Sequence, residues 1–337
     1  MFKGSPRTVT TITPHRISFT GGGTDLPAFT AIQDGEVISS TINQYVYVTV
    51  KKHSPLFGEK YRLSYYKTEH ANELGAIENG IARECLRIVD VEPPLYIATA
   101  SDLPSSSGLG SSSSFAVGLL NALHQLKGEN ICAGQLAEEA CDVEINILGH
   151  PIGKQDQYAA AHGGVNHFRF CKNNSVHVKS LSEITQNIDR IFEQGMLVWT
   201  GVQRDANNVL RSQVSNIEQR LEKYVALVGQ IEECKKILAL NTSGSVRNFG
   251  LFLNKIWEQK RDLDPGISTT EIDELYRRLL DLGFYGGKLS GAGGGGFIFG
   301  VAPKARQKSI INSLGHNRVI RVKRSLHGSR VLSMLRD

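Results

Sequence analysis

Long apolar runs are absent from this chain of 337 residues. No stretch of eighteen consecutive apolar residues occurs, and the N-terminal stretch MFKGSPRTVTTITPHR has no apolar core. A membrane-spanning helix needs about twenty mostly apolar residues, and a signal peptide needs an apolar core of roughly 7–15. We therefore expect a cytoplasmic protein that does not associate with a membrane.

Cysteine is scarce and irregularly spaced. The five cysteines are odd in number and show no C-x-x-C spacing. Disulfide frameworks and zinc sites both depend on regular cysteine patterns. The sequence therefore argues against both and favours inert thiols in a reducing compartment.

A large excess of one charge is also missing. The chain has 38 Lys and Arg against 33 Asp and Glu, a net charge of +5, and no dense basic run. We therefore expect no nucleic acid partner, whereas small anionic substrates are compatible with this balance. The hydrophobic content of 40 % and the length are typical of a globular protein with two medium domains.

The order of predicted elements indicates where the two domains meet. Residues 37–53 alternate like a strand around Tyr45 and Tyr47, and residues 133–149 have the pattern of a helix. The polar stretch NNSVHVKSLSEITQN, near residues 172–190, is the best candidate for the connection. We therefore expect one domain over residues 1–180 and a second over residues 190–337.

The second domain is predicted to begin with a buried strand at residues 195–201. A long helical region follows, with apolar residues three and four apart from Leu210 to Ile231. Regular flanking charges are missing, so a core-facing helix is favoured over a coiled coil. Residues 283–303 contain two apolar strand segments joined by small residues, and NRVIRVKR near the end resembles an edge strand.

Residues 102–114, DLPSSSGLGSSSS, contain seven serines between an apolar strand pattern and an apolar helix pattern. A flexible linker would join two finished units, whereas this stretch interrupts one. A strand, a Gly/Ser turn and a helix in succession present backbone N–H groups and the positive end of the helix dipole to an anion. Small residues let a phosphate approach the backbone. The stretch therefore predicts a phosphate-binding loop, with a solvated serine linker as the alternative.

Two more glycine-rich stretches occur, FTGGGTDLP at residues 19–27 and KLSGAGGGGFIF at residues 288–299. No Lys follows the glycines as the P-loop pattern requires. GAGGGG fits G-x-G-x-x-G, but it leads into a strand and does not open a helix, so a dinucleotide fold is excluded.

Taken in order, the three stretches resemble the motifs of the galactokinase, homoserine kinase, mevalonate kinase and phosphomevalonate kinase (GHMP) superfamily. TPHRISFTGGGTD is similar to the first motif, LPSSSGLGSSSS matches the second, P-x-x-x-G-L-G-S-S, and KLSGAGGGGFIF matches the third. The resemblance extends along the whole chain. It implies an α+β fold: an N-terminal α/β domain like domain 2 of ribosomal protein S5, a C-terminal ferredoxin-like α+β domain, and ATP between them.

The resemblance also implies the cofactors. Backbone amides of the second motif would wrap the triphosphate of ATP, and the third motif would support that loop. A magnesium ion would be held by the Ser112 hydroxyl and by Glu144 on the following helix, since Mg²⁺ prefers oxygen ligands. A plain N-cap and a solvated helix residue are the alternatives for these two side chains. The implied ATP-binding residues are Pro104, Ser106, Ser107, Gly108, Leu109, Gly110, Ser111 and Ser112.

Two further residues, Asp156 and Arg16, match positions to which the family gives a catalytic role, and Lys154 lies two residues before Asp156. Asp156 would be the general base that accepts the proton of the acceptor hydroxyl, with a helix N-cap as the alternative. Arg16 would activate the acceptor or stabilise the transferred charge. Lys154 would neutralise charge or contact the substrate, and an exposed lysine is the alternative.

Galactokinase carries Glu and His before a Thr-Asp pair where this chain has Gly22 and Gly23. This departure argues against galactose and opens space for a bulkier sugar. The GGGTDLP stretch resembles instead the subgroup of heptose phosphate and fucose-type kinases. The implied substrate-binding residues are Gly22, Gly23, Thr24, Asp25, Gln155, Arg204 and Gly291.

The subgroup implies that ATP phosphorylates the anomeric hydroxyl of a heptose 7-phosphate. The acceptor phosphate would then need a cation, for which we nominate Arg204, followed by Lys154 and His15. A kinase of a non-phosphorylated sugar or of a mevalonate-type alcohol and a non-catalytic ATP and sugar sensor remain alternatives. We expect a small-molecule sugar phosphate as the partner and leave a homodimer open.

Overall fold

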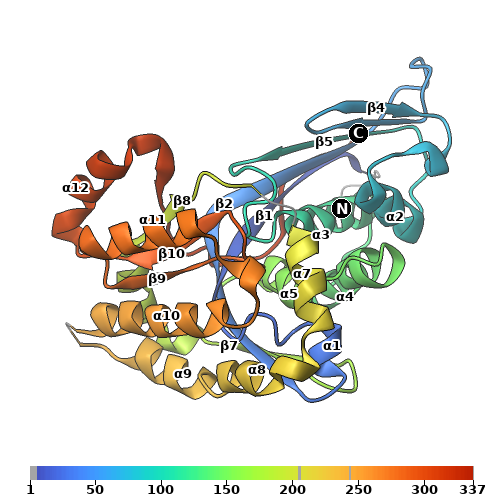
Figure 1. Ribbon diagram of the computed structural model, residues 1–337. Helices are drawn as coiled ribbons and strands as arrows, with labels where there is room; N and C mark the ends of the chain where they lie inside the picture. The colour runs from blue at the N-terminus through green and yellow to red at the C-terminus, as the bar shows by residue number, and fades with distance from the viewer. Residues whose placement is uncertain (1–5, 204–205, 243, 337) are drawn as a thin grey trace.

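The computed structural model of the protein describes residues 6–203, 206–242 and 244–336. Within these ranges the strands form an eight-stranded sheet and a four-stranded sheet, each with its own helices (Figure 1). The strands of the first sheet are β1 (Pro6–Thr20), β2 (Gly35–Lys52), β3 (Tyr61–Ser64), β4 (Thr68–Ala71), β5 (Leu95–Ser101), β6 (Val165–Phe170), β7 (Val176–Ser180) and β12 (Arg330–Arg336). Those of the second are β8 (Gly195–Trp199), β9 (Gly286–Leu289), β10 (Phe297–Val301) and β11 (Val319–Arg321).

The first sheet is built on the long antiparallel pair β1 and β2, and its order is β12-β1-β2-β5-β3-β4, with β6 and β7 extending it beyond β2. Register shifts between Pro14 and Arg16 and between Ser18 and Thr20 mark irregularities in the second half of β1. Such bulges bend a strand and redirect its side chains, and Arg16 lies between these two. The helices of this unit are α1 (Pro27–Thr30), α2 (Gly80–Val89), α3 (Ser111–Lys127), α4 (Ala133–Cys141) and α5 (Gln155–His162).

Helix α3 is apolar on most of its surface and lies closely against the first sheet. Its central residues are buried, and the Thr11 hydroxyl of β1 donates to the Gly118 carbonyl at 2.8 Å. A Cβ on Gly118 would lie 2.7 Å from the Thr13 hydroxyl oxygen, so only glycine allows this approach. Because α3 is fixed on the sheet in this way, its N-terminus is fixed as well.

The second sheet has the order β11-β8-β10-β9 with antiparallel neighbours. Numbered along the chain, its strands lie in the order 4-1-3-2, which is the ferredoxin-like arrangement that we predicted. Its helices are α6 (Thr185–Glu193), α7 (Ala206–Ser215), α8 (Leu221–Val228), α9 (Ile231–Ala239), α10 (Ser245–Arg261), α11 (Thr270–Asp281) and α12 (Lys304–Leu314).

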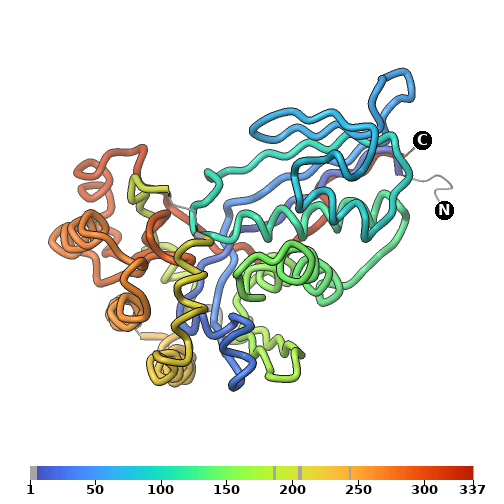
Figure 2. Tube along the Cα trace, turned by 45° about the vertical axis from the view of Figure 1, so that its right-hand side comes forward, coloured from blue at the N-terminus to red at the C-terminus, as the bar shows by residue number. Residues whose placement is uncertain are grey.

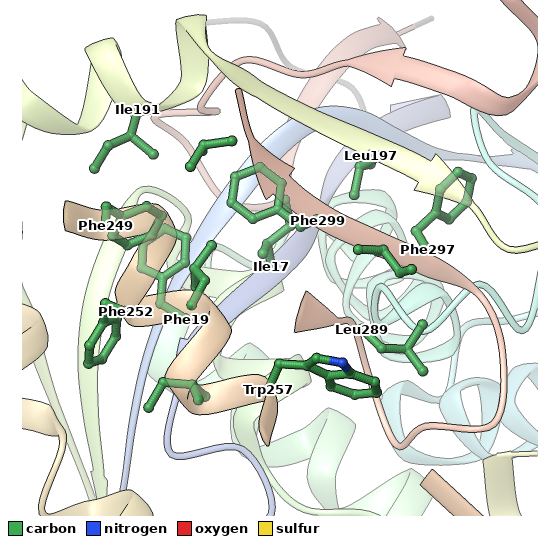
Figure 3. Close-up of a cluster of buried hydrophobic side chains, with 14 of the residues drawn as sticks. Ile17, Phe19, Ile191, Leu197, Phe249, Phe252, Trp257, Leu289, Phe297 and Phe299 are labelled. Atoms are coloured by element: carbon green, nitrogen blue, oxygen red, sulfur yellow. The ribbon is translucent and has the colours of Figure 1, made fainter. Parts of the chain in front are cut away.

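The core of the second unit includes the end of β1. Figure 3 shows Phe249 and Phe252 of α10 near Phe19 of β1 and Phe299 of β10, with Trp257 further along α10 beside Leu289 of β9. The Phe19 and Phe249 rings meet edge to face with centroids 5.1 Å apart. Burial of such rings is a dominant contribution to packing. Strand β1 therefore carries Arg16 into the junction between the two units.

Two details of the chain differ from the predictions. The polar stretch expected as a connection contains β7, which pairs with β6, and the start of α6. The predicted long helix is three helices, α7, α8 and α9, interrupted near residues 216–220 and at Gly229. Most of its predicted apolar face still packs on the core, since Ile217 and Ile231 are buried, but Val225 is 41 % exposed. The predicted edge strand is confirmed by β11 at the edge of the second sheet.

The last strand returns to the first sheet, where β12 pairs antiparallel with β1. The first and last described residues, Pro6 and Arg336, are therefore paired on the same side of the molecule (Figure 2). We propose that the domain boundary lies near residues 180–190, with β12 added to the N-terminal unit. Over the described ranges, no helix has both the length and the apolar character needed to cross a membrane.

Candidate active site

The serine-rich stretch forms a loop that ends at the N-terminus of α3. Ser106, Gly108 and Gly110 have positive φ angles of 57°, 76° and 80°, so the loop turns sharply before the helix begins at Ser111. The N–H groups in the first turn of a helix have no helical carbonyl to bind. Those of α3 therefore point toward the concave side of the loop, where an anion would be stabilised.

The third glycine-rich stretch packs directly against this loop. A Cβ on Gly291 would lie 2.5 Å from the Cα of Gly108, and one on Gly296 would lie 2.4 Å from the Ser107 carbonyl oxygen. The Phe297 N–H donates to that same carbonyl at 3.2 Å. The second unit thus supports the loop of the first through backbone contact.

Arg16 and Asp156 form a bidentate salt bridge beside the serine loop. Arg16 Nε donates to Asp156 Oδ1 at 2.6 Å and Nη2 donates to Oδ2 at 2.7 Å. Arg16 Nη1 donates to the Gly108 carbonyl at 2.9 Å. Asp156 lies in the first turn of α5, and it is more exposed than Arg16. The pair therefore connects β1, the serine loop and α5 at one point.

Asp25 lies next to this pair in a buried position. Its carboxylate accepts from the Gln155 backbone N–H at 3.1 Å, from Gln155 Nε2 at 2.9 Å and from the Gly23 N–H at 3.1 Å. Burial raises the pKa of Asp25, and the nearby Asp156 carboxylate adds to the increase. Each donor to Asp25 thus favours the charged form against the effect of burial.

Glu144 is fully buried on a π-helical turn, η2 (Asp142–Ile147). Its carboxylate accepts from the Ser112 hydroxyl at 2.5 Å and from Gln157 Nε2 at 2.7 Å. Burial raises the pKa of Glu144 because the ionised form loses its hydration. Short π-helical turns within helices are frequent at functional sites.

Two cavities meet at Arg16 and Asp156. The loop cavity is lined by the serine loop, the start of α3, His150, Ile152, Asn207 and Leu210. The inner cavity is lined by Ser18, Gly22, Gly23, Asp25, Leu26, Ile152, Gly153, Gln155, Leu210, Gln213 and Lys260. Both cavities are lined by Arg16, Asp156, Gly291 and Ala292, as well as by Ile152 and Leu210. A group bound in one cavity would therefore reach a group bound in the other at the Arg16–Asp156 pair.

A third, apolar cavity of about 490 Å³ adjoins the serine loop. It shares Ser106, Ser111 and Ser112 with the loop cavity, and its other walls are largely aromatic and aliphatic. The apolar part of its lining consists of Val46, Tyr65, Tyr66, Ile81, Ala100, Leu103 and Phe115. Such a wall suits a flat aromatic ring next to the bound anion.

The structure does not bring every predicted residue to these cavities. Lys154 points elsewhere, with Nζ 3.3 Å from the Asn174 carbonyl oxygen and 3.6 Å from Glu138. Thr24 is buried and bridges Gly21 and Glu36 inside the first loop.

Three more predicted residues lie away from the cavity walls, and one is not described. Leu109 is buried in the core, Pro104 is exposed, and neither lines a cavity named above. His15 is buried with its pKa lowered to about 4 by burial, so it is neutral near pH 7. Arg204 lies outside the described residues.

The sequence prediction missed two buried lysines of the second unit. Lys288 of β9 donates to the carbonyl and hydroxyl of Ser18 at 2.6 and 3.1 Å. Lys260 of α10 lines the inner cavity. Lys288 sits inside a recognised motif, while Lys260 belongs to none. Its burial arises from the packing of α10 against β9, which sequence spacing does not reveal.

The fold and the two adjoining cavities are those expected of a phosphotransferase. Models of the GHMP kinases N terminal domain and of the GHMP kinases C terminal match residues 75–164 and 231–319. The chain therefore belongs to the GHMP kinases, and it is an ATP-dependent sugar kinase. The predicted family and fold class are confirmed.

The chain is also similar along most of its length to individual kinases of this family. The chain is 29 % identical to the D-glycero-alpha-D-manno-heptose 7-phosphate kinase of Campylobacter jejuni, over 91 % of this chain and 93 % of that protein. It is 24 % identical to the galactokinase of Pyrococcus furiosus, over 90 % and 91 % of the two chains. The crystal structure of a D-glycero-D-manno-heptose 1-phosphate kinase from Bacteriodes thetaiotaomicron has the same fold, with a TM-score of 0.76, 24 % identity and coverage of 97 % and 99 %.

Proposed function

We propose that this protein transfers the γ-phosphoryl group of ATP to the anomeric hydroxyl of D-glycero-D-manno-heptose 7-phosphate, giving the 1,7-bisphosphate. The observation that carries the proposal is the junction of the loop cavity and the inner cavity at Arg16 and Asp156. The similarity to a heptose 7-phosphate kinase along nearly the whole chain supports this acceptor. Gly22 and Gly23 line the inner cavity where galactokinase carries Glu and His, and this departure supports an acceptor other than galactose.

In this proposal ATP lies with its triphosphate in the loop cavity and its adenine in the apolar cavity. The sugar lies in the inner cavity, where the Asp25 carboxylate accepts hydrogen bonds from its hydroxyls. Asp156 accepts the proton of the anomeric hydroxyl while that oxygen bonds to the γ-phosphorus and the bond to the β-phosphate oxygen breaks. Arg16 stabilises the charge that develops on the transferred group, and ADP leaves.

Ser112 in the wall of the loop cavity and Glu144, which is buried behind it and hydrogen-bonded to it, also fit a magnesium ion, which GHMP kinases generally use with ATP. Glu144 is a fully buried carboxylate whose hydrogen-bond partners in the described part of the chain, Ser112, Ser113 and Gln157, are neutral donors. A buried carboxylate without a counter-charge is costly, and a hard divalent cation would supply that charge. We propose that Ser112 and Glu144 hold the ion, which would neutralise the phosphates of ATP.

Replacing Glu144 should change the need for magnesium. For Glu144→Gln we expect the Mg²⁺ concentration at half-maximal rate to rise roughly tenfold, because a neutral amide is a weaker ligand for a hard cation. The KM for the sugar should change little. A titration of activity with Mg²⁺ at saturating substrates measures this. An unchanged titration with a normal kcat would place the ion elsewhere.

The proposed adenine site can be tested through Phe115. For Phe115→Ala we expect the KM for ATP to rise roughly tenfold, since losing an aromatic contact to a base costs about 1–3 kcal/mol. Phe57→Ala is the matched control, because Phe57 is partly exposed and stacks on His53, away from these cavities. Equal KM values in both variants would reject the apolar cavity as the adenine site.

The acceptor is tested by measuring ADP release with Mg²⁺ and a panel of alcohols. We expect the highest kcat/KM with D-glycero-D-manno-heptose 7-phosphate, and much lower values with mannose, fucose, galactose and mevalonate. A preference for a free sugar would reject the phosphorylated acceptor. Binding of ATP and sugar without turnover would indicate a sensor.

A further inference from the structure

Lys260 occupies an unusual position at the end of α10. Its side chain is buried, with 6 % of the residue exposed, yet it lines the inner cavity. Nζ donates to the Gly291 carbonyl and, at 3.3 Å, to the Leu289 carbonyl. An ammonium group has three donors, so these two acceptors leave one donor for another partner. The side chain is thus held in place by backbone groups and keeps one donor for the cavity.

No counter-charge pairs with this ammonium group. Both of its acceptors are neutral carbonyls, and no carboxylate of the described residues forms an ion pair with it. An unpaired buried charge is costly, and proteins usually pair it or bind an ion. A buried lysine in this position either loses its proton or gains an anionic partner, and its place in the wall of the inner cavity gives an anion access to it.

The other cations near the cavity are already occupied. Arg16 gives three of its donors to Asp156 and Gly108. Lys288 donates to Ser18 beneath the cavity wall. Lys154 contacts Asn174 and Glu138. Among the lining residues that the structure describes, Lys260 is the cation that an anionic ligand would meet without displacing a carboxylate.

We propose that Lys260 binds the phosphate of the phosphorylated acceptor, which deepens and rests on the function proposed above. Lys260 lines the inner cavity and does not line the loop cavity, so its ligand is the acceptor and not ATP. A sugar hydroxyl would leave the buried charge uncompensated, whereas a phosphate dianion compensates it. The charge of Lys260 thereby selects a phosphorylated sugar over a free one.

The protonation state of Lys260 makes this selection depend on pH. Burial and the charge of Arg16 lower the pKa of Lys260 to about 7, against the opposing effect of Asp156 and Asp25. Lys288 of β9 is a further neighbouring cation. A bound phosphate dianion stabilises the protonated form and raises this pKa. Binding is therefore strongest below pH 7 and weakens as the pH rises above 7, where the free lysine loses its proton.

The test compares heptose 7-phosphate with unphosphorylated heptose as acceptors for wild type and Lys260→Met. We expect the KM for heptose 7-phosphate to rise roughly ten- to hundredfold in the variant, the range for a lost charge-assisted contact. The KM values for ATP and for free heptose should stay near those of wild type. Lys255→Met on the same helix is the control, because Lys255 is exposed and contacts Gln230 and Glu233.

A second measurement uses the wild-type protein alone and does not depend on the folding of a variant. Between about pH 6.5 and 8.5 we expect the KM for heptose 7-phosphate, divided by that for free heptose, to rise roughly tenfold as the lysine deprotonates. A flat ratio would overturn the proposal.

The outcomes separate this inference from the proposed function. If wild type fails to phosphorylate heptose 7-phosphate, the proposed function is wrong. If wild type prefers heptose 7-phosphate and Lys260→Met keeps the same preference, only the role of Lys260 is wrong. An equal loss with both acceptors would also reject it, because Lys260 would then act on the sugar ring or on the transferred group.

Discussion

Asp156→Asn is expected to lower kcat by roughly 10²–10⁴-fold, the usual contribution of a positioned general base. Asparagine keeps the shape of the side chain, but it cannot accept the proton of the acceptor hydroxyl. The variant also replaces the two carboxylate acceptors of Arg16, which is 4 % exposed, by one neutral amide oxygen and an NH₂ group that cannot accept. We therefore expect a lower melting temperature as well, since breaking a buried ion pair typically costs about 3–5 kcal/mol.

Binding measurements separate the two effects of this substitution. ATP affinity, measured by titration calorimetry on the folded variant, should survive, because the serine loop and the start of α3 are unchanged. Asp34→Asn is a matched control: Asp34 also accepts two hydrogen bonds from one arginine, Arg169, at 3.0 and 2.8 Å, but at the surface. That control should keep full activity. A kcat for Asp156→Asn above about a tenth of wild type would contradict the assignment of the base.

The elements around the active site were predictable where a local pattern sets the backbone. The strand, serine turn and apolar helix at residues 95–126 predicted the loop at the N-terminus of α3, which the structure contains. Glu144 and Ser112 were paired through the family resemblance, and they are hydrogen-bonded in the structure. In the first case the order of neighbouring elements fixes the geometry, whereas the second pair came from the family resemblance and not from spacing.

The predictions that depended on tertiary packing were less successful. Lys154 and Asp156 are two residues apart, but only Asp156 faces the cavities, because Lys154 lies at the start of α5 and contacts Asn174. In the sequence, Lys260 is indistinguishable from an ordinary exposed basic residue in the last turn of a helix, next to Arg261. Its burial depends on contact between α10 and β9, which lies further along the chain.

The three glycine-rich stretches also show that contacts made by tertiary packing cannot be predicted from the sequence pattern. Their composition predicted close approach of the backbone, but not which stretch contacts which. The structure brings Gly291 and Gly108 together from different units, and it places Gly21 and Gly35 in contact with backbone groups within the first unit. Only the folded arrangement of the two sheets determines these contacts.

The contact between the second and third stretches leads to the other large effect that we expect. Gly291→Ala should lower kcat/KM for ATP at least about a hundredfold, since a displacement of roughly 1 Å in a positioning element can cost that much. The new Cβ would lie 2.5 Å from the Cα of Gly108 and 2.6 Å from its carbonyl oxygen, so one of the two backbones must move. Movement of Gly108 disturbs the loop and its hydrogen bond from Arg16.

Gly128→Ala is the control that isolates this packing effect from backbone strain. Gly128 caps α3 with a φ of +87°, close to the +72° of Gly291, but a Cβ on Gly128 would meet nothing within 4 Å. Both variants should lose about 1 kcal/mol of stability from the left-handed conformation. Only Gly291→Ala should also lose activity and ATP affinity, measured by steady-state kinetics and calorimetry. Similar kinetics in the two variants would mean that contact between the second and third glycine-rich stretches does not position the phosphate-binding loop. The loop would then be fixed by its attachment to α3 alone.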